Sequence, residues 1–383
     1  MIRIALHMLM GESAKYFAIV AGVMFASLLL VQQLCMFTGI LRQMYSGISA
    51  VNADIWVMDP KMRFIDDSKP MTDGQLGRVR SVDGVAWAVG LYKGSLQAKL
   101  ENGETEGVAL YGLDDTTFIG GPAVMTAGRL ADLRQSEAVV VDAKSAGDKL
   151  AHVGPNGVKT PLRVGDTLEL NDHRVIVVGL CEVSRGFQSQ PVVYTTYTRA
   201  LSIAPSQRKN LSFILAAAQS GQSKEAVAAR IGRITGLGAY TSPQFIEKTL
   251  RYFITETSIV LNFGVSVLIA VFVGTLIAGQ TFYNFTIDNL RHFGALKAMG
   301  AENRILRAMI LTQAALVGFL GYGAGTGLAC AFGWVMQDSM MTFTLPWQVL
   351  VFTGLVVVGI AAFSALLSLR KVMQLEPGIV FRG

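Results

Sequence analysis

The residue types best able to carry chemistry, histidine and cysteine, are scattered along the sequence. The four histidines, none of which has a second histidine or a cysteine at metal-ligand spacing, are His7, His152, His173 and His292. The three cysteines, which are equally far apart, are Cys35, Cys181 and Cys330. Such residues bind metals or form disulfide frameworks when several lie at suitable spacing, so the sequence predicts neither a metal site nor a disulfide framework.

Two catalytic motifs are also missing. No stretch reads Gly-x-x-x-x-Gly-Lys followed by Ser or Thr, the loop whose backbone cradles nucleotide phosphates, and there is no Gly-x-Ser-x-Gly elbow. The sequence therefore predicts that the chain is not an enzyme and binds no cofactor itself. If ATP and Mg drive its function, a separate polypeptide must bind them.

Composition places part of the chain in lipid. Its 383 residues are 51% hydrophobic and 16% charged, and the mean hydropathy is +0.44. These values are too apolar for a wholly water-soluble protein. The formal net charge of +6 forms no dense basic run, so it indicates membrane topology rather than nucleic-acid binding.

Four segments are long and apolar enough to cross a bilayer, which takes about 20 residues as a helix. They are 16–41, 258–285, 305–336 and 347–369. The apolar stretch of the first exceeds that of a signal peptide, so we expect an uncleaved anchor. No Asp, Glu, Lys or Arg lies in the interior of any span. Ion-coupled carriers need such groups at mid-membrane, so the energy for any transport must come from elsewhere.

Basic residues in the short flanks predict the orientation. Basic residues gather around the link 286–304, which carries Arg291, Lys297 and Arg304 and is followed at once by Arg307. The tail 370–383 carries Arg370, Lys371 and Arg382. The link before the fourth span carries neither Lys nor Arg. By the positive-inside rule, we expect both termini of this multi-pass membrane protein to be cytoplasmic. Residues 1–15 fit an amphipathic cytoplasmic lead-in and, almost equally well, a bland segment.

The long insert 42–257 alternates strand-like runs with turn residues. Its best hairpin candidate is 168–178 around Asn171-Asp172, and 224–234 has helical spacing. The length allows one sizeable core or two small subdomains. The predicted fold class is an α-helical membrane protein with four transmembrane helices plus a mixed α+β extracytoplasmic domain inserted between helices 1 and 2.

Small residues in the third span predict close helix packing. Two glycine pairs with a spacing of four are present: Gly321 with Gly325, and Gly323 with Gly327. Glycines at this spacing let two helix backbones approach, either within one chain or between two copies. The sequence does not identify the partner helix, and glycine is common in membrane helices generally.

The most specific string is RHFGALKAMGAENRILRAMI, which begins at Arg291. Phe293, Leu296 and Met299 follow at helical spacing, and Gly300 then interrupts the helix. We interpret the segment as an interfacial helix that offers an apolar ridge and a cationic edge to a cytoplasmic partner. The alternative is an ordinary basic flank that only obeys membrane topology.

This string resembles the signature of the MacB/FtsX-type (mechanotransmission, type VII) permeases of ATP-binding cassette (ABC) systems. The matching residues are Arg291, Gly294, Lys297, Ala298, Met299, Gly300 and Ala301. The chain departs from the signature at His292, where the family usually has Glu. YGLD from Tyr111, SEAVVVD from Ser136 and RVGDTLEL from Arg163 are similar to the family's periplasmic domain, and GIL at 39–41 looks like the DevC branch.

The resemblance implies a permease subunit of the bacterial inner (plasma) membrane that works as a homodimer in efflux or extraction. Two copies of an ABC ATPase would supply ATP-driven motion, and a periplasmic membrane-fusion adaptor with an outer-membrane channel would receive the cargo. The implied ATPase-coupling residues are Arg291, His292, Phe293, Gly294, Leu296, Lys297, Met299, Gly300 and Ala301. The alternative is a signal transmitter that activates a periplasmic partner such as a cell-wall hydrolase, without transport.

Overall fold

A computed structural model describes residues 13–67, 69–154, 158–183, 186, 189–205, 210–336 and 343–373. The chain divides into two compact units. The inserted domain is Leu41–Thr257, and the membrane unit comprises the described parts of Met1–Ile40 and Ser258–Gly383. Most of the predicted lead-in and of the predicted tail lies outside the described residues.

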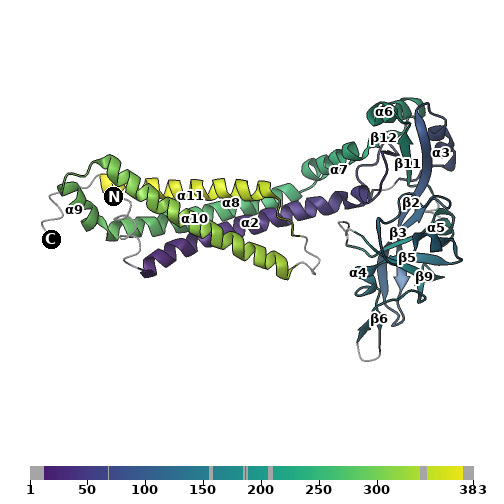
Figure 1. The fold of residues 1–383 in the computed structure, drawn as a ribbon, viewed down its shortest axis with the longest axis horizontal. Helices are drawn as coiled ribbons and strands as arrows, with labels where there is room; N and C mark the ends of the chain where they lie inside the picture. The colour runs from purple at the N-terminus through teal and green to yellow at the C-terminus, as the bar shows by residue number, and fades with distance from the viewer. Residues whose placement is uncertain are drawn as a thin grey trace. The chain divides into compact units, whose positions relative to one another are not determined.

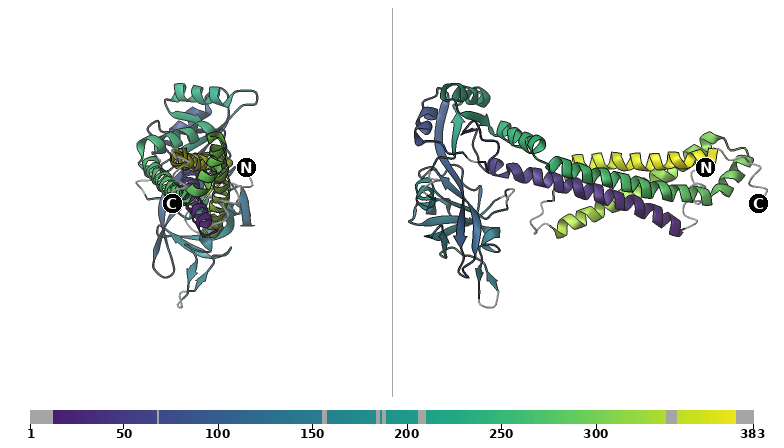
Figure 2. Two further views of the ribbon diagram at one scale, coloured as in Figure 1. Left: turned by 90° about the vertical axis from the view of Figure 1, so that its left-hand side faces the viewer. Right: turned by 180° about the vertical axis from the view of Figure 1, so that it is seen from behind.

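The membrane unit consists of long helices. They are α2 (Ser13–Ser49), α8 (Ile259–Asp288), α10 (Asn303–Val335) and α11 (Trp347–Met373). A short helix, α9 (Leu290–Ala298), lies between α8 and α10 in the chain. Each of the four long helices is long and apolar enough to cross a membrane. In Figure 1, α8 and α11 run side by side and α10 crosses the bundle, an arrangement that the second views in Figure 2 repeat.

The first helix extends beyond its predicted end. The apolar run stops at Leu41, but α2 continues to Ser49 and so ends within the inserted domain. The added residues, RQMYSGIS, contain no proline and begin with good helix formers, so nothing breaks the helix where the apolar run stops. A hydropathy window detects the lipid-facing part of a helix and not its end.

The first part of the inserted domain is a four-stranded antiparallel sheet with two helices. Its strands are β1 (Ile55–Met58), β2 (Val85–Lys99), β11 (Phe213–Ala218) and β12 (Gly238–Thr241), in the order β12-β1-β11-β2. Helix α3 (Asp73–Arg80) follows β1, and α6 (Lys224–Thr235) follows β11. This β-α-β-β-α-β order is the ferredoxin-like split βαβ arrangement.

Side chains alternate between the two faces of this sheet. Ile55 and Val57 of β1 face the core under α3 and α6, whereas Trp56 and Met58 face the opposite core. That second core also contains Ile48, near the end of α2, and Phe245 of α7 (Ser242–Glu256). The two helices that connect the inserted domain to the membrane unit therefore share one face of the sheet.

The second part of the domain is a closed ring of strands. It comprises β3 (Thr105–Leu113), β10 (Val192–Thr196), β5 (Ala138–Asp142), β9 (His173–Glu182), β8 (Thr167–Leu170) and the far half of β2. Successive pairings β2–β3, β3–β10, β10–β5, β5–β9, β9–β8 and β8–β2 close the ring. Its interior is filled by aliphatic side chains such as Leu110, Val177 and Val193.

The smaller elements border these sheets. They are β4 (Val124–Gly128), η1 (Leu130–Arg134), α4 (Ala143–Ala146), β6 (His152–Val153), β7 (Lys159–Thr160) and α5 (Tyr197–Ile203). The predicted hairpin is confirmed, because β8 and β9 pair antiparallel and Asn171 and Asp172 both have positive φ. The predicted fold class, four candidate membrane helices plus an inserted α+β domain, is confirmed as well.

Candidate functional site

Helix α9 and the turn after it form the segment for which the sequence predicts partner binding. The amide of Asn289 donates to the carbonyl of Phe285 at 2.9 Å, where α8 ends and α9 begins. At the other end, Gly300 has φ +91°, its N–H donates to the Lys297 carbonyl at 3.1 Å, and the Ala301 N–H donates to the Leu296 carbonyl at 3.0 Å. These two bonds form a Schellman turn, which requires a left-handed residue at Gly300.

The predicted apolar ridge on α9 is wrong in part. Phe293 is 1% exposed and lies in the core of the membrane unit, and Leu296 packs against the same core. Met299 is 76% exposed. Met299 lies six residues after Phe293, and each residue of a helix advances about 100° around the axis. The two side chains therefore point about 120° apart, so Met299 cannot share the face of Phe293.

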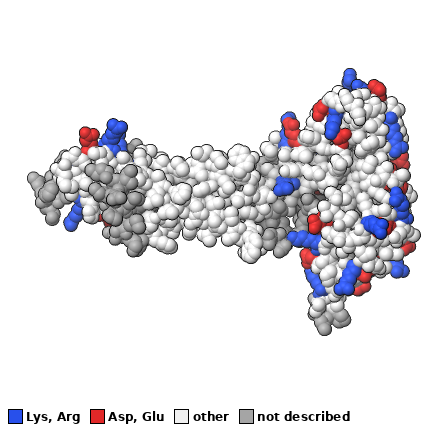
Figure 3. All heavy atoms as spheres, viewed as in Figure 1, with Lys and Arg blue, Asp and Glu red and all other residues white. Residues whose placement is uncertain are grey.

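The predicted coupling residues thus divide into two sets. Phe293 and Gly294 are buried, and Leu296, Lys297 and Ala301 are partly buried. The exposed set, together with neighbours that the structure adds, is Arg291, His292, Ala295, Ala298, Met299, Gly300, Arg304 and Arg307. On the face drawn in Figure 3, charged side chains gather at one end of the membrane unit, while the helices beyond that end are free of them among the described residues. The exposed set is a mainly cationic surface with one large apolar side chain, beside which the acidic Asp288 and Glu302 are also exposed. Its coupling role stays a prediction.

Only one of the two glycine pairs in α10 lies at a helix contact. A Cβ at Gly321 would lie 2.8 Å from the Cβ of Val23, and one at Gly325 would lie 2.7 Å from the Cβ of Ser27 and 2.9 Å from the backbone nitrogen of Leu28. The partner helix is therefore α2. Gly323 and Gly327 have nothing within 4 Å of an added Cβ.

On an adjoining face, α2 meets α8 equally closely. A Cβ at Gly22 of α2 would lie 2.6 Å from Ile277, and one at Gly274 of α8 would overlap Ala26. Helix α2 therefore lies between two helices that approach through glycines, and any movement of α2 must involve both neighbours.

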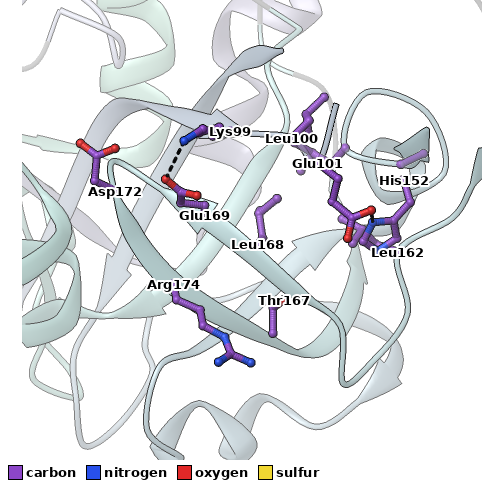
Figure 4. A pocket seen from close by; sticks show the side chains of 12 residues that line it. Lys99, Leu100, Glu101, His152, Leu162, Thr167, Leu168, Glu169, Asp172 and Arg174 are labelled. Carbon is purple, nitrogen blue, oxygen red and sulfur yellow. Dashed lines mark ion pairs between the residues drawn. The ribbon is translucent and has the colours of Figure 1, made fainter. Parts of the chain in front are cut away.

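The inserted domain has an open hollow of about 500 Å³ at the side of the strand ring. Figure 4 shows Glu101 and His152 together at one end, the Lys99–Glu169 pair at the other, and Leu168 between them. The Nδ1 atom of His152 lies 3.0 Å from Glu101 and its Nε2 lies 3.4 Å from Asp166. Both ring nitrogens are thus engaged with carboxylates. No group of three His, Cys, Asp or Glu that could hold a metal occurs in the part of the chain that the structure describes.

Cys181 of β9, in the core that also contains Trp56, is expected to resist thiol reagents. Its side chain is fully buried, and burial, followed by the nearby Asp142 carboxylate, raises its pKa to about 12. Because the thiolate is the reactive form, maleimide should label Cys181 roughly 1,000-fold more slowly than a thiol of ordinary pKa. The measurement is peptide mass spectrometry after timed labelling of the folded chain, with Thr126→Cys on the exposed surface of β4 as the control. Rapid labelling of Cys181 in the folded chain would contradict the buried position.

An aromatic junction of Trp56, Phe213 and Phe245 was not expected from the sequence. Trp56 is fully buried, with ring centroids 5.2 Å from Phe213 and 5.6 Å from Phe245. One signal for α7 was available, because Thr241 and Gln244 form a capping box and Pro243 occupies the first turn. The contact of Trp56 with α7 had no local signal, since the two are separated by most of the domain.

Two family models match the chain. The MacB-like periplasmic core domain matches residues 16–234, and the FtsX-like permease C-terminal matches residues 264–377. An uncharacterized ABC transporter permease of Mycobacterium tuberculosis is 24% identical over 222 residues, which are 57% of this chain and 58% of that protein. One of Mycobacterium bovis is 27% identical over 111 residues, 29% of this chain and 31% of that protein. The matches thus span less than two thirds of these curated relatives.

Two solved structures resemble the inserted domain distantly. The extracellular domain of the noncanonic ABC-type transporter YknZ from Gram-positive bacteria has a TM-score of 0.34 at 16% identity, covering 49% of this chain and 98% of that one. The periplasmic region of MacB from Actinobacillus actinomycetemcomitans has a TM-score of 0.37 at 17% identity, covering 53% of this chain and 95% of that one.

Proposed function

Because the chain belongs to the family of FtsX-like permeases with a MacB-like periplasmic core domain, we propose that it is the permease subunit of an ABC system. A separate ATPase subunit, present in two copies with ATP and Mg, drives it. The sequence supports this division of labour, because it contains no phosphate-cradling loop and its spans have no interior Asp, Glu, Lys or Arg. The chain itself then transmits motion and catalyses no reaction.

The single observation that carries the proposal is the two-sided construction of α9. One side, with Phe293, is anchored in the helix core, and the other presents Arg291, His292 and Met299 to solvent. A helix held this way transfers a push on its exposed side to the bundle, because packed interiors transmit strain. In this proposal the exposed residues contact the ATPase, Phe293, Gly294 and Leu296 anchor the helix, and Gly300 with Ala301 set the turn into α10.

The proposed orientation places α9 in the cytoplasm. Arg291, Arg304 and Arg307 are exposed around α9 and the start of α10, and such clusters mark cytoplasmic flanks. Both termini are then cytoplasmic, and the inserted domain lies on the opposite side of the inner membrane. In this proposal, two copies of the chain form a homodimer. A periplasmic adaptor and an outer-membrane channel receive the cargo, so the system works in export or extraction.

Met299→Asp tests the coupling surface. The Met299 side chain is exposed, so an aspartate there should leave membrane insertion and folding intact. Loss of this apolar contact should weaken ATPase binding, or the stimulation of ATP turnover by the permease, by about tenfold or more. Co-purification and ATP turnover of the complex in nanodiscs measure this effect. Ile234→Asp is the matched control, because Ile234 is an apolar side chain of the inserted domain that is 58% exposed.

Phe293→Ala separates anchoring from contact. It removes a buried ring, so it should lower the stability of the membrane unit by about 3–5 kcal/mol.

Unchanged ATPase binding and turnover in Met299→Asp would remove the coupling assignment. If the complex instead couples ATP turnover to a periplasmic hydrolase, with no adaptor and no transported cargo, the chain is a signal transmitter and not an export permease.

A further inference from the structure

We propose that residues 59–67, the bridging loop, couple α2 and α7 to each other and to the sheet of the inserted domain. Three consecutive residues of this loop contact three different elements. Phe64 contacts α7, Ile65 contacts the last turns of α2, and Asp66 contacts β2. The role of the loop in an ATP cycle rests on the proposed function, whereas its mechanical role is a property of the chain alone.

The contact with α7 is aromatic. The ring of Phe64 stacks on Tyr252 with centroids 5.2 Å apart and planes at 14°, and it lies 5.1 Å from the ring of Phe253. The guanidinium of Arg63 lies over the ring of Tyr252, 5.2 Å from its centroid. Aromatic pairs at these distances stabilise beyond simple area burial, and the cation adds to them. The last turns of α7 are therefore attached to the loop.

The contact between the loop and α2 depends on a glycine, Gly47, at which any side chain would meet Ile65. Ile65 is 3% exposed, and a Cβ at Gly47 would lie 3.0 Å from its Cδ1 atom and 3.4 Å from the hydroxyl of Tyr111. Such spacing leaves no room for a larger residue without displacing Ile65. Gly47 lies two residues before the end of α2, so the end of the helix and the loop fit against each other.

The contact with the sheet is an ion pair. The ammonium of Lys93 on β2 bonds to the carboxylate of Asp66, and these side chains are only 10% and 24% exposed. Lys93 also lies 5.6 Å from the ring centroid of Tyr111, and its backbone N–H donates to the Ser212 hydroxyl of the chain entering β11 at 3.0 Å. Removing one member of a partly buried pair leaves the other charge uncompensated. The loop is thus held to β2, where this strand passes from the four-stranded sheet to the strand ring.

The loop is preformed rather than pliable. Met62 is fully buried in the core shared with Trp56, and its N–H donates to the Asp59 carbonyl at 3.0 Å. The Asp67 N–H donates to the Phe64 carbonyl at 3.0 Å, and the Asp67 carboxylate accepts from the Arg63 N–H at 3.2 Å. In the proposed coupling, these two turns, each closed by its own hydrogen bonds, move together. A displacement of Ile65 by α2 is therefore passed to Phe64 and α7.

The test is hydrogen–deuterium exchange of the full chain in lipid nanodiscs. Gly47→Leu should push Ile65 aside and raise amide exchange in the second half of α7 by about tenfold, the scale expected when one well-packed contact is lost. Phe64→Ala should do the same, and the double variant should exchange no faster than Phe64→Ala, because both changes open the same connection. Gly77→Leu on α3, where an added Cβ meets nothing within 4 Å, is the matched control.

An α7 that does not respond to Gly47→Leu, or a double variant whose effects simply add, would overturn the bridging role. A second arm measures ATP turnover and transport in the complex with the ATPase. Phe64→Ala should leave ATPase binding unchanged and lower transport per ATP at least about threefold, because motion of α2 no longer reaches α7. If the exchange coupling holds but transport per ATP does not change, the bridging loop stands as a mechanical connection and its role in the ATP cycle is overturned. A complex of the unsubstituted chain with the ATPase that transports nothing would instead overturn the proposed function.

Discussion

Gly325→Ala is expected to destabilise the membrane unit by about 1–3 kcal/mol, the cost of forcing a methyl group into a packed contact. The added Cβ would lie 2.7 Å from the Cβ of Ser27 and 2.9 Å from the backbone nitrogen of Leu28. A backbone atom cannot rotate away as a side chain can, so α10 and α2 must separate. Unfolding of the chain in lipid–detergent micelles, followed as the SDS fraction rises, measures the loss.

Gly327→Ala, two residues further along α10, should have the opposite sign. Nothing lies within 4 Å of the position of its Cβ, and alanine favours the helical backbone over glycine by about 0.5–1 kcal/mol. The two variants add the same atom to the same helix, so their difference isolates the contact with α2. Equal effects of the two substitutions would contradict the assignment of Gly321 and Gly325 to the interface.

These glycines illustrate what the sequence can specify about the membrane unit. Spacing alone identified two pairs, because residues four apart lie on one helix face. It could not say which pair faces a neighbour, since Gly323 and Gly327 have the same spacing. That choice depends on how α10 is rotated against α2, which is a tertiary property. The four spans themselves were predictable because lipid imposes a length and an apolar composition on each helix separately.

The inserted domain shows a similar limit. The turn at Asn171-Asp172 was predictable because both residues tolerate positive φ, as a two-residue hairpin requires. The strand ring was not, because two of its pairings, β10–β3 and β5–β9, are parallel and join segments that are far apart in the sequence. Strand β2 also belongs to both sheets, so a strand signal at 85–99 could not reveal the division into two parts.

The error on α9 has a different cause. Phe293 and Met299 were assigned to one ridge because steps of three residues are helical, but a second step of three turns the side chain away from the first. The structure places Phe293 in the core with Leu306 and Phe282. Burial of a phenylalanine is the usual outcome, and an exposed methionine at the end of a helix is the less common one. The candidate contact surface is consequently centred on Met299.

Trp56→Ala is expected to have the largest effect on the inserted domain, a loss of about 3–5 kcal/mol. The indole is fully buried between Phe213 and Phe245, and its Nε1–H donates to the Ser242 hydroxyl at 3.2 Å. Ser242 in turn donates to the Ala53 carbonyl at 2.7 Å. Trp56 therefore joins β1, β11 and the first turn of α7, and its removal opens a cavity and detaches the helix that leads to α8.

Two further variants separate the parts of this effect. Trp56→Phe keeps an aromatic ring but loses the donor to Ser242, so it should cost about 1 kcal/mol beyond the lost volume. Trp87→Ala, at a half-buried tryptophan of β2, is the control and should cost less than Trp56→Ala. Proteolysis of the nanodisc-embedded chain in increasing urea reports cleavage within 41–257. If Trp56→Ala unfolds at the same urea concentration as Trp87→Ala, the junction does not hold α7 to the sheet.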